Sequence, residues 1–136
     1  MAQQEYYRGF KDLNCWKEAR QLRLQISVLC KQLPADEKYL LVNQIVKASR
    51  SVTANIAEGY GRFTYIDTRH FFIQARGSVT EIMDHLIVAF DENYISQEIL
   101  NEFDKQCEKV FKLLNGYITY LDKEKLKAKP VIPPNS

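Results

Sequence analysis

The sequence predicts an all-α protein, an up-down-up-down antiparallel four-helix bundle. Apolar residues recur at steps of three and four along four long segments, and no segment alternates in the two-residue pattern of a strand. The five Gly and four Pro fall mainly between these segments, where they end helices. The 136 residues fit one domain. We place the bundle at 1–122 and a flexible Lys- and Pro-rich tail at 123–136.

The first two helices are expected at about 12–33 and 37–58. Pro34 ends the first helix, and Asp36 is the expected N-cap of the second. Gly59 comes next, where a glycine in the left-handed conformation would close the second helix. The apolar stripes of the two helices are Leu13, Trp16, Ala19, Leu22, Ile26, Leu29 and Leu33, then Leu41, Ile45, Ala48, Val52 and Ile56.

The third and fourth helices are expected at about 64–92 and 97–122. Thr64 and Asp67 have the spacing of a capping box, and Ser96 is the expected N-cap of the fourth helix. Their apolar stripes are Phe72, Ala75, Val79, Ile82, Leu86 and Phe90, then Ile99, Phe103, Cys107, Val110, Leu114, Tyr117 and Leu121. Short connections between long amphipathic helices make neighbouring helices antiparallel, which gives the bundle.

Composition narrows the class of protein. The three cysteines, Cys15, Cys30 and Cys107, are odd in number and widely spaced, so they fit neither a disulfide framework nor a zinc site. No apolar run approaches the ~18 residues that span a bilayer. We therefore expect a cytoplasmic protein with no membrane partner. The formal net charge is only +2, so nucleic-acid binding depends on where the charges lie.

Basic residues gather in three places. Arg62, Arg69 and Arg76 recur every seven residues, which would keep them on one face of the third helix as a basic ridge suited to phosphate. The same residues fit a structural role equally well, as partners of acids on neighbouring helices. The first helix, which includes Arg20 and Arg23, has five basic and two acidic residues over 11–33, and the tail has four basic and one acidic.

A polar stripe adjoins the apolar stripe of the second helix. Its members are Gln44, Lys47, Ser51, Asn55 and Glu58. Such a row is either a solvated shoulder or a hydrogen-bonded row that fixes how a partner helix docks. A glycine inside the fourth helix, Gly116, costs about 1 kcal/mol relative to alanine, so a close neighbour is expected there.

Catalysis has little support in the sequence. Asp67 and His70 have the carboxylate-to-histidine spacing of di-metal bundles, but the second pair, Glu81 and His85, has the wrong spacing. A metal-dependent bundle enzyme is therefore the most distant alternative. No Gly-rich phosphate loop follows a strand, and no credible catalytic grouping of Ser or Cys with His is present. We predict no enzyme activity, no metal and no cofactor.

The segment 44–96 carries a set of specific motifs. They are Gln44, Lys47, the run 51–62 with its Asn-Ile-Ala-Glu-Gly core, the run 71–78, Glu81 and the turn 93–96. With these motifs the chain resembles, over about 10–121, the bacterial four helix bundle protein family, also called the 23S rRNA intervening-sequence or S23 ribosomal protein family. The family often has two adjacent basic residues after the glutamine. Here Lys47 and Arg50 are separated by two residues, so we carry over no basic contact to them.

The resemblance implies a homopentameric ring of bundles with a basic surface. It also implies likeness to the accessory variability determinant of diversity-generating retroelements, which binds a reverse transcriptase and nucleic acid. The residues expected to serve assembly or packing are Gln44, Ser51, Asn55, Glu58, Gly77, Ser78 and Glu81. We expect a close backbone neighbour at Gly77 for the same reason as at Gly116.

The resulting hypothesis is a non-enzymatic accessory protein whose ring binds nucleic acid. The expected contacts are Arg62, Arg69, Arg76, Arg20 and Arg23. The alternative is a protein scaffold that binds only a partner protein and uses these arginines in salt bridges.

Overall fold

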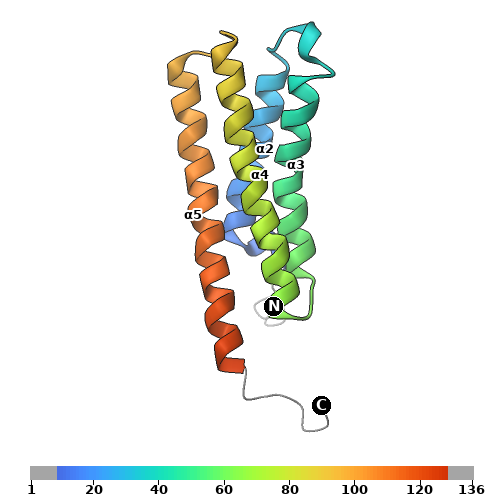
Figure 1. The fold of residues 1–136 in the computed structure, drawn as a ribbon, viewed down its shortest axis with the longest axis vertical. Coiled ribbons are helices and arrows are strands. Elements are labelled where there is room, and N and C mark those ends of the chain that lie inside the picture. Colours follow the sequence, from blue (N-terminus) through green and yellow to red (C-terminus); the bar gives the residue numbers. More distant parts are fainter. Residues whose placement is uncertain (1–8, 129–136) are drawn as a thin grey trace, which may run out of the picture.

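The computed structural model describes residues 9–128 and has four long helices that pack side by side (Figure 1). They are α2 (Asn14–Cys30), α3 (Leu41–Tyr60), α4 (Tyr65–Asp91) and α5 (Gln97–Ala128), with the short 3-10 helices η1 (Phe10–Asp12) and η2 (Ala35–Glu37). Helix α2 packs on α3 and α5, and α4 packs on the same two helices. The predicted four-helix bundle is confirmed. None of the described helices is long and apolar enough to cross a membrane.

The first connection is longer than expected. Helix α2 ends at Cys30, because the amides of Lys31 and Gln32 bond the carbonyls three residues back, which tightens the chain before Pro34. Helix α3 begins at Leu41 and not at residue 37, so the expected N-cap at Asp36 is wrong. Residue 36 lies within η2, which precedes the start of α3 by several residues.

Glu37, and not Asp36, accepts a hydrogen bond from the first turn of α3. Its Oε1 accepts a hydrogen bond from the amide of Leu41 at 3.3 Å, in the first turn of α3. Its Oε2 accepts one from the hydroxyl of Tyr94 at 2.7 Å, and Tyr94 lies in the α4–α5 connection. One carboxylate therefore starts a helix and ties together the two connections at one end of the bundle.

Gly59 is a helical residue and not the left-handed glycine that we predicted. Helix α3 continues through Tyr60, and none of the described glycines has a positive φ. A Cβ at Gly59 would lie 2.8 Å from Cβ of Phe71 and 3.0 Å from Cδ1 of Phe72. The missing side chain is thus needed because α4 packs closely on α3 at this point.

Both ends of α4 have side chains or turns that satisfy the helix termini. Oγ1 of Thr64 accepts a hydrogen bond from the amide of Asp67 at 3.1 Å, as expected for the N-cap. At the other end Asn93 has a φ of 65°. The amides of Asn93 and Tyr94 then bond the carbonyls of Phe90 and Ala89, both at 2.9 Å, which is the Schellman arrangement.

Helix α5 is longer than predicted. It starts where expected, with Oγ of Ser96 accepting a hydrogen bond from the amide of Ile99 at 3.2 Å. It runs to Ala128, so the first six residues of the predicted tail are helical, and α5 extends past the α3–α4 turn (Figure 1). The remainder of that tail, 129–136, lies outside the described residues.

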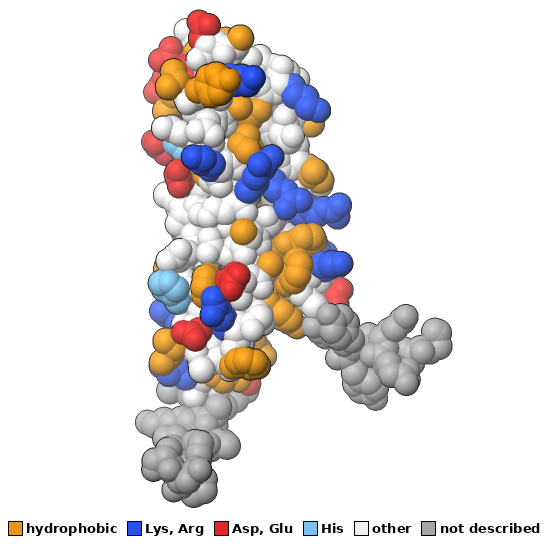
Figure 2. Space-filling model, turned by 90° about the vertical axis from the view of Figure 1, so that its right-hand side faces the viewer, with side chains coloured by type: hydrophobic (Ala, Val, Ile, Leu, Met, Phe, Trp, Pro, Cys, Tyr) orange, Lys and Arg blue, Asp and Glu red, His pale blue; other side chains and the backbone are white. Residues whose placement is uncertain are grey.

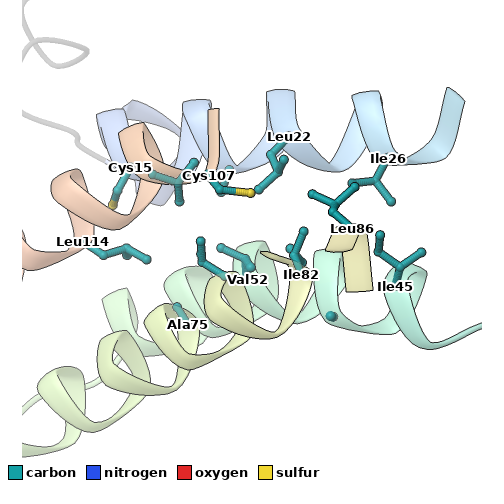
Figure 3. Packing of buried hydrophobic residues seen from close by; sticks show 14 of the residues in the cluster. Cys15, Leu22, Ile26, Ile45, Val52, Ala75, Ile82, Leu86, Cys107 and Leu114 are labelled. Atoms are coloured by element: carbon teal, nitrogen blue, oxygen red, sulfur yellow. The ribbon is translucent and has the colours of Figure 1, made fainter. Parts of the chain in front are cut away.

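The core lies between the four helices and contains the predicted stripes (Figure 3). Its largest fully buried side chains include Phe72, Leu22, Ile26, Ile45, Ile56, Ile82, Leu86 and Leu114. The stripe of α5 starts differently from the prediction, because Leu100 is buried and Ile99 is exposed. The close neighbours expected at Gly77 and Gly116 are absent from the described part of the chain, since a Cβ at either glycine would meet none of its atoms within 4 Å.

Candidate nucleic-acid interface

The three arginines of the predicted ridge do not share one face. Helix α4 begins at Tyr65, so Arg62 lies in the preceding turn, outside the helical periodicity. Its Nη2 lies 2.7 Å from Oε2 of Glu58 on α3, and its guanidinium lies over the ring of Phe71 at 4.7 Å. Arg62 therefore contacts α3 and the start of α4.

Arg69 and Arg76 both reach α5. Nε of Arg69 lies 2.8 Å from Oδ1 of Asp122, and Nη1 of Arg76 donates to Oδ1 of Asn115 at 2.7 Å. The Arg69 and Asp122 side chains are 44% and 48% exposed, and ion pairs this exposed contribute roughly 0–1 kcal/mol. Two of the three arginines are thus paired with carboxylates, and the third is bonded to an amide oxygen.

A second basic region lies on α2 and α3, where Figure 2 shows a band of Lys and Arg side chains crossing the face at mid-height. The Lys and Arg residues of these two helices are Lys17, Arg20, Arg23, Lys47 and Arg50, and we call this set the α2–α3 basic face. Within residues 9–128 none of these five cations is in an ion pair. Their charge is therefore available to an external anion.

The carboxylates of the same two helices are engaged elsewhere. Helix α2 has one, Glu18, whose Oε1 lies 3.8 Å from Nζ of Lys109 and accepts a hydrogen bond from Gln106 at 3.0 Å. Both of these partners are on α5. Helix α3 also has one, Glu58, which pairs with Arg62. The α2–α3 basic face consequently keeps an uncompensated positive charge.

Between α2 and α3 the basic face contains a hollow of about 160 Å³. Its lining residues are Arg23, Leu24, Ser27, Cys30, Val46, Ser49 and Arg50. Nη1 of Arg23 crosses from α2 to donate a hydrogen bond to Oγ1 of Thr53 on α3 at 2.9 Å. Arg20 is exposed, and its guanidinium lies 5.9 Å from the centre of the Trp16 ring.

The predicted polar stripe divides into a bonded centre and exposed ends. Oγ of Ser51 and Oγ of Ser78 are 2.8 Å apart across α3 and α4. Nδ2 of Asn55 donates to the carbonyl oxygen and to Oγ of Ser51, both at 2.9 Å. Gln44 and Lys47 are exposed. The centre of the stripe therefore joins α3 to α4 within one chain.

Two further predicted assembly residues lie on the outside of α4. Gly77 is exposed, and Oε2 of the exposed Glu81 lies 3.2 Å from Nε2 of the mostly buried His85. The other histidine, His70, lies 3.0 Å from Nε2 of Gln74. Across residues 9–128 no three His, Cys, Asp or Glu side chains are grouped as metal ligands.

The three cysteines are free thiols. Burial raises the pKa of Cys15 to about 11 and that of Cys107 to about 12. It also raises the pKa of Cys30, which is only half-buried. Thiolates are the reactive form of cysteine, so none of the three is activated as a nucleophile.

The fold and its charged surface define a class, a small all-α bundle with a basic face on α2 and α3 whose cations are in no ion pair with the described residues. The chain belongs to the 23S rRNA-intervening sequence protein family, whose profile matches residues 11–116. The family predicted from the motifs is thereby confirmed. No protein with a curated description matches the sequence.

A solved structure has a similar fold. It is a protein of unknown function from the S23 ribosomal protein family of Bacteroides thetaiotaomicron. The TM-score is 0.72 at 22% sequence identity, and the match covers 77% of this chain and 95% of that one. At this identity the likeness supports the fold alone.

The sequence predicted Arg20 and Arg23 as nucleic-acid contacts but did not predict Arg50. The charge of the first helix was a sufficient signal for the first two residues. One feature of the sequence could have indicated Arg50. Residues 41–57 contain no Asp or Glu, so Arg50 has no acidic neighbour in that segment. Its position beside Arg23 follows only from the packing of α3 on α2.

Proposed function

We propose that this protein is a non-enzymatic accessory protein that binds nucleic acid through the α2–α3 basic face. The observation that carries the proposal is that five cations share this face while both carboxylates of its helices are engaged elsewhere. Lys and Arg that neutralise backbone phosphates release counterions, which is the main source of sequence-independent affinity. Three of the five are arginines, whose planar guanidinium suits phosphate.

This face has better support than the arginine row. A carboxylate partner offsets the positive charge of an arginine and so weakens its attraction for phosphate, and both Arg62 and Arg69 are so paired. Arg20 and Arg50 have no such partner among the described residues. We therefore assign the main contact to the α2–α3 basic face and a minor one to Arg62, Arg69 and Arg76.

We also propose that the protein assembles into a homo-oligomeric ring, with five copies as the resemblance implies. An exposed glycine inside α4, Gly77, supports this assembly, because such a glycine costs helix stability and leaves room for another backbone. A ring would repeat the basic face around its circumference and multiply its charge.

The resemblance also implies a protein partner, a reverse transcriptase, which we include in the proposal. The free thiols suit a reducing compartment such as the cytoplasm.

The test compares two triple variants that remove the same charge. Arg20, Arg23 and Arg50 are changed to Gln in one, and Arg62, Arg69 and Arg76 in the other. Binding of single-stranded and duplex RNA and DNA is followed by fluorescence anisotropy over a salt series. In the first variant the slope of log affinity against log salt should flatten by about one unit for each phosphate that the protein no longer neutralises. The second should change it little.

Helix content and mass must match the parent protein for either result to count. A larger effect in the second variant would move the contact to the arginine row. If the parent protein binds no nucleic acid even at low salt, the proposal is wrong and a scaffold for a partner protein becomes the better account. Deletion of 129–136 in the parent measures any contribution from the end of the chain.

A further inference from the structure

The hollow between α2 and α3 is lined by one arginine from each helix. Arg23 comes from α2 and Arg50 from α3, and Ser27 and Ser49 belong to the same lining. No carboxylate lines the hollow. Two cations beside one small volume repel each other, and an anion that enters between them relieves this repulsion.

Arg23 is held in place by a neutral partner. Oγ1 of Thr53 donates its own proton to the carbonyl of Arg50 at 3.2 Å, which leaves its oxygen free to accept from Nη1 of Arg23 at 2.9 Å. The Arg23 side chain is half-buried, and this is its single hydrogen bond within residues 9–128. A guanidinium has five N–H donors. Most of those on Arg23 therefore remain available at full charge in a fixed position.

Arg50 supplies the opposite side. Its side chain is exposed and makes no hydrogen bond or ion pair with the described residues. The hydroxyl of Ser49 donates to the carbonyl of Val46 at 3.0 Å, whereas that of Ser27 has no protein partner in the described chain. Leu24, Val46 and Cys30 complete the lining with apolar surface.

We propose that this hollow binds one phosphate group, held between the guanidiniums of Arg23 and Arg50 with the hydroxyl of Ser27 as a further donor. The inference rests on the proposed function and deepens it, because it names the point on the basic face where a phosphate is held. Guanidinium forks donate paired hydrogen bonds to phosphate oxygens. The group is either a phosphodiester of a nucleic-acid backbone or the phosphate of a free nucleotide.

Cys30 provides a direct reporter of the hollow. It lines the site and is half-buried, whereas Cys15 and Cys107 are 4% and 0% exposed. Alkylation of the native protein by iodoacetamide at mildly alkaline pH should therefore modify Cys30 first, at a rate read by mass spectrometry. Bound phosphate should slow this reaction, because it covers the thiol and disfavours the thiolate.

The experiment measures the Cys30 alkylation rate in the full-length protein at constant ionic strength. The additions are inorganic phosphate, pyrophosphate, adenosine triphosphate or a short single-stranded RNA, with potassium chloride as the control. We expect saturable protection by the phosphate compounds and none by chloride. Protection by RNA alone assigns the site to a phosphodiester, and protection by free phosphate compounds as well assigns it to any phosphate group.

Arg50→Gln is the main variant, because the Arg50 side chain makes no bond that the fold needs. It should weaken protection by about tenfold, as expected when a charge-assisted hydrogen bond is removed. Thr53→Val, which keeps all charges but removes the partner of Arg23, should weaken protection less. Lys112→Gln is the matched control, since it removes one positive charge from an exposed position between α4 and α5, outside the hollow, and should leave protection unchanged.

The inference is overturned if no phosphate compound protects Cys30, or if Arg50→Gln and Lys112→Gln reduce protection equally. The experiments distinguish a failure of the phosphate site from a failure of the proposed nucleic-acid function. Salt-dependent RNA binding without protection of Cys30 would reject the phosphate site and keep the nucleic-acid function. Protection by pyrophosphate without RNA or DNA binding at any salt would keep the phosphate site and reject nucleic acid as its ligand.

Discussion

Substitution of three helical glycines by alanine separates close packing from helix propensity. Alanine gains about 1 kcal/mol over glycine inside a helix, and this gain is common to all three sites. At Gly77 and Gly116 the new methyl group meets nothing within 4 Å. At Gly59 it would lie 2.8 Å from Cβ of Phe71. That atom is fixed to the backbone of α4, so the two helices must separate.

We expect Gly116→Ala to stabilise the fold by about 0.5–1 kcal/mol, and Gly77→Ala to do the same for the single chain apart from any effect on assembly. Forcing a methyl group into a packed contact costs about 1–3 kcal/mol, so Gly59→Ala should be less stable than the other two variants by about that amount. Urea unfolding followed by circular dichroism measures the difference, at one protein concentration because assembly contributes to stability. Equal stability of Gly59→Ala and Gly116→Ala would refute the argument that close helix packing requires Gly59.

Three other perturbations test separate features. Asn93→Ala should cost about 1 kcal/mol in thermal unfolding because of the left-handed backbone, whereas Asn93→Gly should be nearly neutral. The hydrogen bond to Glu37 raises the pKa of Tyr94 to about 12, and burial raises that of Tyr117 to about 12, both from 10.0. The folded state holds these protons more tightly, so stability should fall between about pH 10 and 12. The fall in alkaline titrations should be shallower in Tyr94→Phe. Asn55→Leu should change the mass or solubility of the assembly more than helix content, and unchanged light scattering would make Asn55 an ordinary residue of the α3–α4 contact.

The oligomeric state can be measured directly by light scattering. Light scattering that gives the mass of one 15.9 kDa chain would reject the ring. Gly77→Ala adds a sharper comparison, because its methyl group is harmless within one chain. If Gly77 faces another copy closely, this variant should lower the mass of the assembly while Gly116→Ala leaves it unchanged.

The fold was predictable because its signal is local and repeated. Apolar steps of three and four mark each helix, and burial of Ile45, Ile82 and Leu114 follows from those steps. The start of α3 was not predictable in the same way. It depends on Glu37, whose carboxylate is held by Tyr94, a residue 57 positions away in the sequence. The role of Gly59 also needs the position of a second helix.

The candidate site was predictable only in part. Charge along the chain pointed to Arg20 and Arg23. It could not show that Arg62 precedes α4 or that Arg69 reaches Asp122, because both facts depend on where a helix starts and on which helix lies beside it. Net charge per segment counts cations, whereas binding depends on which cations lack a partner after packing.

The extension of α5 beyond the α3–α4 turn affects how the end of the chain can contribute to binding. Lys123 and Lys125 belong to the last turns of α5, and Lys125 lies beside Ile66 and Arg69 of α4, so a ligand that touches them need not order them at about 1–2 kcal/mol per residue. The end of a helix also frays before the bundle unfolds. Any affinity that it contributes should therefore disappear on warming at a temperature where the bundle, and the hollow between α2 and α3, are still intact.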